Sequence, residues 1–206
     1  MSSIKKILAI VLILAITLGM VLEAGAAGSP TEGYDAKTDT YTEKTATSTV
    51  TTKVATKAVE AVESTKSSVT LSTSKDASDK EFDIKQIGDG TNGVFDSAEG
   101  RKVTKVTSKS KATKMTLATN AFKGSKVKKV VIENTRLTVK ADAFNGVSGL
   151  TLDCRKSTKH SQLKFAKDSL KGVKKIILNK KLSATNRAKI LKKLKAAGFK
   201  GKVAYK

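Results

Sequence analysis

Apolar and polar residues follow a pattern that occurs three times between Leu117 and Leu178. In each unit a short apolar pair comes first, a five-residue phrase ending in glycine follows, and a strand-like apolar run closes the unit. The three phrases are Asn120-Ala121-Phe122-Lys123-Gly124, Asp142-Ala143-Phe144-Asn145-Gly146 and Asp168-Ser169-Leu170-Lys171-Gly172. The glycines lie 22 and then 26 residues apart. Recurrence at this length is typical of stacked coils in a solenoid.

Each phrase predicts a tight turn that buries one large side chain. We therefore expect the repeat core to consist of the three large residues and the three glycines of the phrases: Phe122, Gly124, Phe144, Gly146, Leu170 and Gly172. The runs that follow the phrases, 127–132, 150–154 and 175–178, are expected to be strands.

Residues 1–27 have the pattern of an export signal. Lys5 and Lys6 precede an apolar run over 7–22, and the small residues Ala24-Gly25-Ala26 follow it. We expect cleavage near Ala26/Ala27 and a secreted or cell-surface protein that meets the membrane only through this segment. A retained membrane anchor is the alternative, because the run approaches the roughly 17 to 25 residues that span a bilayer.

Residues 28–80 differ in composition from the rest. Thr, Ser, Ala, Lys and Glu predominate, Phe and Ile are absent, and Leu71 is the only leucine. A segment with so little apolar surface is expected to be a disordered Thr/Ser-rich linker. It would hold a binding domain away from a surface, or act as a spacer without a task of its own.

The folded domain is expected over residues 81–206. Residues 81–110 suggest an N-terminal cap around a turn-rich run. Within that run Asp89, Asn92 and Asp96 loosely resemble calcium ligands, but the later glutamate of an EF-hand loop is missing, so a hairpin turn is favoured.

The far end, 183–206, predicts a capping helix followed by a short strand. Ser183 is placed to cap the helix, Ile190, Leu191 and Leu194 form an apolar stripe, and Gly198 follows the helix. A basic amphipathic helix on an anionic membrane is the alternative. Packing on the last coil is favoured, since the stripe is narrow.

The phrases, with the strands Val127-Lys128-Lys129-Val130-Val131-Ile132 and Lys174-Lys175-Ile176-Ile177-Leu178, resemble the BspA-type leucine-rich repeats of bacterial surface proteins. That family's coil carries an Ala-Phe-x-Gly/Asn turn and then a Leu-x-x-Val-x-Ile strand. The resemblance covers about 103–205. It implies a β-rich (α+β), short leucine-rich-repeat solenoid with a C-terminal capping helix. The cysteine usual after the glycine is Ser125 or Val147 here, and the third phrase has Ser169-Leu170.

Charge is divided unevenly along the chain. Residues 1–100 carry a net charge of −4 and residues 101–206 a net charge of +26. A field of one sign attracts polyanions, so an anionic cell-wall polymer or acidic glycan is the expected partner, with anionic lipid and non-specific nucleic acid as further candidates. Lysine greatly outnumbers arginine and acts as a point charge, so salt-sensitive binding is expected. The alternative is that the lysines only keep the domain soluble.

Two lysine clusters follow the glycines of their coils. If the coils stack in register, the clusters share an edge of the solenoid about 10 Å apart, close to one Debye length at 0.1 M salt. The candidate polyanion-binding residues are Lys126, Lys128, Lys129, Lys171, Lys174 and Lys175. The alternative partner is a surface protein bound to the strand face, with Thr151, Asp153 and Ile177 pointing outward.

No catalytic, cofactor-binding or metal-binding set is expected, and we expect a non-enzymatic protein. His160 and Cys154 are each the single residue of their type: the histidine falls in an insertion over 155–162 and is expected to be solvated, whereas the cysteine falls at a buried strand position. A Cys–His pair would require both to converge in one pocket, and zinc requires more ligands. The acids after residue 100 are Glu133, Asp142, Asp153 and Asp168, and they could pair for glycoside hydrolysis. Asp142 and Asp168 occupy the same place in successive turns, so a turn-capping role explains these two better.

Overall fold

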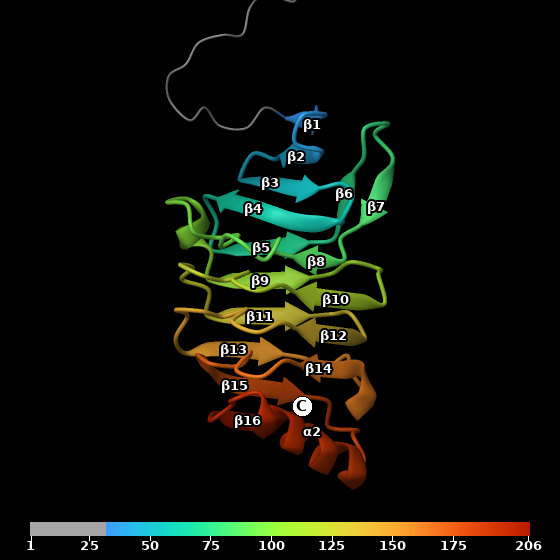
Figure 1. The fold of residues 1–206 in the computed structure, drawn as a ribbon, viewed down its shortest axis with the longest axis vertical. Coiled ribbons are helices and arrows are strands. Elements are labelled where there is room, and N and C mark those ends of the chain that lie inside the picture. Colours follow the sequence, from blue (N-terminus) through green and yellow to red (C-terminus); the bar gives the residue numbers. More distant parts are fainter. Residues whose placement is uncertain (1–31) are drawn as a thin grey trace, which may run out of the picture. The chain divides into compact units, whose positions relative to one another are not determined.

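The computed structural model describes residues 32–206 (Figure 1). This part of the chain is rich in β-strands and contains one α-helix, with an eight-stranded sheet, a six-stranded sheet and a two-stranded hairpin. The expected export signal lies outside the described residues. Within them, no helix combines the length and the hydropathy needed to cross a membrane.

From residue 105 to residue 178, successive strands alternate between the two large sheets (Figure 1). Neighbouring strands within each sheet run parallel here. The six-stranded sheet receives β9 (Lys105–Ser108), β11 (Lys129–Ile132), β13 (Leu150–Asp153), β15 (Val173–Leu178) and β16 (Lys202–Tyr205). The eight-stranded sheet receives β10 (Lys114–Leu117), β12 (Arg136–Val139) and β14 (Leu163–Phe165). The chain therefore forms a stack of two-strand units.

One hydrophobic core lies between the two sheets. Every second side chain of a strand points to the same face, and most of the inward ones are apolar in both sheets. Met115 and Leu137 of the eight-stranded sheet join Val106 and Val130 of the six-stranded sheet in a single buried cluster. The intervening residues of each strand therefore face away from this core on two different surfaces.

The three phrases form equivalent turns between the sheets, with Phe122, Phe144 and Leu170 all buried as the sequence pattern predicts. The polar residue that opens each phrase has a positive φ of 54° to 60°, a conformation that Asn and Asp tolerate better than most residues. In the third turn, a Cβ on Gly172 would lie 2.0 Å from the Val147 carbonyl oxygen, at a φ of +84°. Only glycine fits there.

The prediction of disorder over 28–80 is wrong for most of that range. Residues 33–64 form an antiparallel meander that extends the eight-stranded sheet. Its strands are β1 (Gly33–Asp35), β2 (Thr40–Lys44), β3 (Ser48–Lys53) and β4 (Ala58–Ser64). Next, β5 (Ser68–Leu71) pairs with β9, and β6 (Thr73–Lys75) pairs with β7 (Glu81–Asp83). The few apolar residues of this segment suffice because they enter the shared core: Val59, Val62, Val69 and Leu71.

The expected N-terminal cap over 81–110 is also differently placed. This range holds β7, β8 (Gln86–Ile87), the 3-10 turn η1 (Gly100–Lys102) and β9, and both β8 and β9 belong to the stacked sheets. Phe95, between β8 and β9, occupies a further turn in line with Phe122. The antiparallel meander lies beyond β8 instead, where β4 pairs with it.

The C-terminal residues form the expected helix and strand. Ser183 caps helix α2 (Ala184–Ala196) by accepting a hydrogen bond from the Asn186 backbone N–H. Ile190 and Leu194 are buried, whereas Leu191, expected in the same stripe, is 45% exposed. The chain then returns to the six-stranded sheet as β16, parallel to β15.

Candidate polyanion-binding face

A row of lysines crosses the outer face of the six-stranded sheet. The strand register places Lys105 beside Lys129, Lys129 beside Thr151, Thr151 beside Lys175, and Lys175 beside Lys202. We call Lys105, Lys129, Lys175 and Lys202 the lysine row. Each precedes an inward-facing apolar residue in its strand, so its own side chain faces outward.

The lysine row spans about 19 Å, because it covers four strand spacings of about 4.8 Å each. Lys105 and Lys202 are exposed, and Lys129 and Lys175 are half-buried. The ion pairs within residues 32–206 are Lys75–Asp79, Lys102–Glu99, Arg155–Asp153 and Lys171–Asp168, and none involves the row. No carboxylate of the described chain therefore neutralises these four ammonium groups by direct contact.

The structure brings together part of the lysine set that the sequence indicated. Lys129 and Lys175 lie in one register row two strands apart, as in-register stacking of the coils predicts, and they lie on a sheet face and not at an edge. The others lie off the row: Lys128 donates to the Ser148 carbonyl oxygen at 3.2 Å, and Lys174 occupies the irregularity where the β13–β15 register shifts. Lys126 and Lys171 are exposed in the turns, and Lys171 pairs with Asp168 at 3.6 Å.

Sequence reasoning missed Lys105 and Lys202, since neither follows one of the three phrases. The signal that could have found them is simpler. In four strands of this sheet a lysine stands directly before an inward apolar residue, as in Lys105-Val106 and Lys202-Val203.

The next outward row of the same sheet is largely covered. Asp153 and Ile177 are 2% and 6% exposed, although both occupy outward positions. The Arg155 guanidinium donates to both carboxylate oxygens of Asp153, with Nε–Oδ1 at 2.9 Å and Nη2–Oδ2 at 2.8 Å. These hydrogen bonds and the carboxylate charge raise the pKa of Arg155. The surface that this strand face offers to a docking protein is thus limited to the half-buried Thr151 and its neighbours.

A pocket of about 400 Å³ opens beside this covered pair. Its charges are mixed, because Arg155, Lys156 and Lys206 share it with Glu133 and Asp153. The Arg155 side chain remains 48% exposed although Asp153 fixes its orientation. The pocket therefore holds an oriented guanidinium together with carboxylates that repel anions.

The cysteine and the histidine have separate structural surroundings. Cys154 is fully buried, and burial followed by the charge of Asp153 raises the pKa of its thiol far above the ordinary value. His160 was expected to be solvated, but it is half-buried, and both its backbone N–H and its ring Nδ1 lie 2.9 Å from the Asn186 Oδ1. The insertion that carries it is anchored to α2.

The remaining candidate acids have structural surroundings. Asp142 and Asp168 stand at the positive-φ positions of their turns, Asp153 is bound to Arg155, and Glu133 is exposed. The Asp89 carboxylate accepts hydrogen bonds from the backbone N–H groups of Thr91 and Asn92, as in a closed turn.

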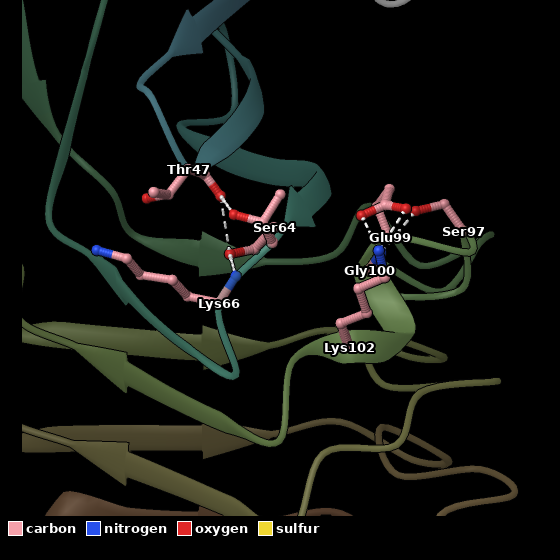
Figure 2. Close-up of polar contacts among 8 residues, drawn as sticks. Thr47, Ser64, Lys66, Ser97, Glu99, Gly100 and Lys102 are labelled. Carbon is pink, nitrogen blue, oxygen red and sulfur yellow. Dashed lines mark hydrogen bonds and ion pairs between the residues drawn. The ribbon is translucent and has the colours of Figure 1, made fainter.

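A second hollow, of about 270 Å³, lies where the antiparallel meander meets η1 (Figure 2). Its polar groups are engaged with one another. The Ser64 hydroxyl donates to the Thr47 carbonyl oxygen and accepts from the Lys66 backbone N–H, and Lys102 binds both carboxylate oxygens of Glu99. This hollow is lined by the acidic residues Glu63 and Glu99 and by no cation, so it does not extend the basic face.

No protein-family model matches this chain, and comparison with curated proteins and with solved structures finds no significant match.

Proposed function

We propose that this protein is an exported, non-enzymatic surface or secreted protein that binds anionic polymers through the lysine row. Its fold in this proposal is a short solenoid of the BspA-like leucine-rich-repeat type, and its ligand is an acidic cell-wall polymer or an acidic glycan. The observation that carries the proposal is the in-register row of four lysines without a carboxylate partner in residues 32–206.

The geometry favours a polymer over a small anion. A row about 19 Å long with charges at strand spacing can contact several successive anionic groups of a chain. Ammonium groups attract as point charges without the fork geometry of arginine, so the row discriminates weakly among polyanions. Binding releases counterions from the polymer, and its affinity should therefore fall steeply with salt.

Binding of a folded protein on the strand face is the alternative function. The covered positions of Asp153 and Ile177 leave that face little exposed apolar surface. Such an interface would depend weakly on salt, whereas the lysine row predicts a steep dependence.

The test compares two variants with the same change in charge. One replaces the four residues of the lysine row by glutamine; the control replaces four exposed lysines of the C-terminal cap, Lys189, Lys192, Lys195 and Lys200. Lys193 is left out because it donates to the His160 and Leu163 carbonyl oxygens. Fluorescence anisotropy of labelled heparin and of labelled poly(glycerol phosphate) is measured across a salt series.

In the row variant, the steepness of the fall of log K with log salt should decrease by up to about four. The control variant should retain most of the steepness of the unmodified chain. Equal losses in the two variants would show that only total charge matters and that the row is not a site. A salt-independent affinity of the unmodified chain for both polymers would overturn the polyanion proposal.

Export has its own test. N-terminal sequencing of protein from the culture medium should begin at Ala27 or Gly28. Recovery of an intact segment 1–22 in membrane fractions would instead indicate a retained anchor.

A further inference from the structure

The outer face of the eight-stranded sheet carries a separate pocket of about 470 Å³. Its lining is basic and polar throughout: Lys114, Arg136, Thr138, Ser161, Gln162 and Lys164. No carboxylate lines it. This volume falls in the range of roughly 300 to 1,000 Å³ that is typical of small-ligand sites. The pocket is therefore larger than one inorganic anion requires.

The strand register brings the cations together. Lys114 lies beside Arg136 in the pairing of β10 with β12, and Thr138 lies beside Lys164 in the pairing of β12 with β14. All four alternate with buried residues of the same strands, so they face outward. None of the three cations belongs to an ion pair of the described chain.

Strands β10, β12 and β14 form the floor of the pocket, and the 3-10 turn η2 (His160–Gln162) forms a wall beside them. This turn is part of the insertion that lengthens the second repeat spacing. Helix α2 holds this wall in place: the Lys193 Nζ donates to the carbonyl oxygens of His160 at 2.7 Å and Leu163 at 2.9 Å. The Gln162 Oε1 accepts from the backbone N–H groups of Thr158 at 2.7 Å and Lys159 at 2.8 Å. Since its oxygen is occupied, Gln162 has its amide N–H groups left to donate.

The pocket thus combines one guanidinium, two ammonium groups, two hydroxyls and an amide donor. Arginine binds phosphate and sulfate through two parallel N–H donors, which lysine cannot do. The positive field also reaches beyond the pocket. Burial, and secondarily the charge of Lys164, lowers the pKa of Lys193 behind the wall.

We propose that this pocket is a second anion site that takes one sugar or polyol unit bearing a phosphate or sulfate ester, with Arg136 gripping the ester oxygens. Together with the lysine row it would let a single molecule bridge two polyanion chains. The bridging step rests on the proposed function of the row. Bridging is geometrically possible because the core lies between the two sheets. The pocket therefore opens on the outer face of the eight-stranded sheet, and the lysine row lies on the outer face of the six-stranded sheet.

The pocket is tested by isothermal titration of the full chain with two small probes, a sulfated disaccharide and glycerol 3-phosphate, which separate the two ester chemistries. At least one probe should bind at one site per chain. The double variant Arg136→Gln/Lys164→Gln should weaken that binding at least tenfold, and Arg136→Lys, which keeps the charge without the fork, should weaken it less. The matched control is Arg101→Gln/Lys109→Gln, two exposed cations outside the pocket. Absence of binding by both probes, or equal losses in the double variant and the control, would overturn the site.

Bridging is tested by light scattering with long heparin and long poly(glycerol phosphate) chains. The unmodified chain should give a scattering maximum near charge equivalence. The pocket variant should lose that maximum while keeping the polymer affinity and salt slope that the lysine row supplies. Persistence of the maximum in the pocket variant would refute bridging. Failure of the row itself would show differently, as an unchanged salt slope in the row variant.

Discussion

Replacing Phe122 by alanine removes the middle ring of a stack that joins three successive turns. Its ring centroid lies 5.5 Å from that of Phe95 and 5.2 Å from that of Phe144, and the side chain is fully buried. A buried Phe→Ala change costs about 3 to 5 kcal/mol through lost burial and the cavity left behind. Each stacked pair adds about 0.5 to 1.5 kcal/mol. We therefore expect a loss of about 5 kcal/mol for Phe122→Ala and about 1 kcal/mol less for Phe144→Ala, which loses one stacked pair.

Urea denaturation followed by circular dichroism measures both free energies of unfolding. Lys123→Ala is the matched control, because Lys123 is exposed in the same turn and should change stability by less than about 0.5 kcal/mol. Phe122→Leu retains most of the volume and separates the stacking contribution from the cavity. A Phe122→Ala midpoint equal to that of the control would refute the buried turn. A larger loss for Phe144→Ala than for Phe122→Ala would refute the stacking contribution.

Two further substitutions and one unmodified residue, Cys154, test other features of the repeat. Ser169 occupies the position that Ala121 holds in the first phrase, and its buried hydroxyl has no hydrogen-bond partner in the described chain; Ser169→Ala should raise the free energy of unfolding by about 1 kcal/mol in urea denaturation. Gly172→Ala should lower the melting temperature, because the added Cβ would collide with the Val147 carbonyl oxygen. Cys154 should resist alkylation in native buffer and react on addition of urea. Its raised pKa also means that stability is lost as pH rises above the ordinary thiol value of 9.0, where only the unfolded thiol ionises.

The turns could be predicted because their chemistry is local. A large apolar side chain between a residue that tolerates positive φ and a glycine specifies a buried turn without reference to the rest of the chain. Asn120, Asp142 and Asp168 all have the positive φ that this reasoning requires. The turn at Phe95 was not predicted, because its phrase, Val94-Phe95-Asp96-Ser97, lacks both the alanine and the glycine of the other phrases.

The strands over 33–75 could not be predicted from composition, because their burial depends on distant residues. Val69 and Leu71 point into a core completed by β9 and the strands after it. Threonine and valine favour strands, yet strand propensity depends on the neighbours that a sheet supplies. Thr52 illustrates this, since it is fully buried within a run that the sequence presents as polar.

The lysine row required knowledge of register. Lys105 and Lys202 are separated by 97 positions in the sequence, yet four strand pairings place them at the two ends of one row. The basic pocket depended further on the insertion over 155–162, whose wall is positioned by Lys193 of a helix more than thirty residues away. Charge totals indicated a basic domain. Only the pairing of the strands shows which lysines lie together and which are dispersed over the surface.

The arrangement of charges is costly for the fold, and this cost supports a role in binding. Like charges directly opposite in neighbouring strands are destabilising, and opposite charges there contribute about 0.2 to 1 kcal/mol per pair. A sheet built only for solubility would gain from a glutamate beside Lys105 or Lys175, as mixed surface charges are equally soluble. The chain has 18 acidic residues, and most of them fall within residues 32–100, which carry a net charge of −5. In the row, by contrast, Lys105 lies beside Lys129 and Lys175 beside Lys202. A polyanion on the row would supply the missing opposite charge, so in the proposed function binding and stability would be linked through the same four ammonium groups.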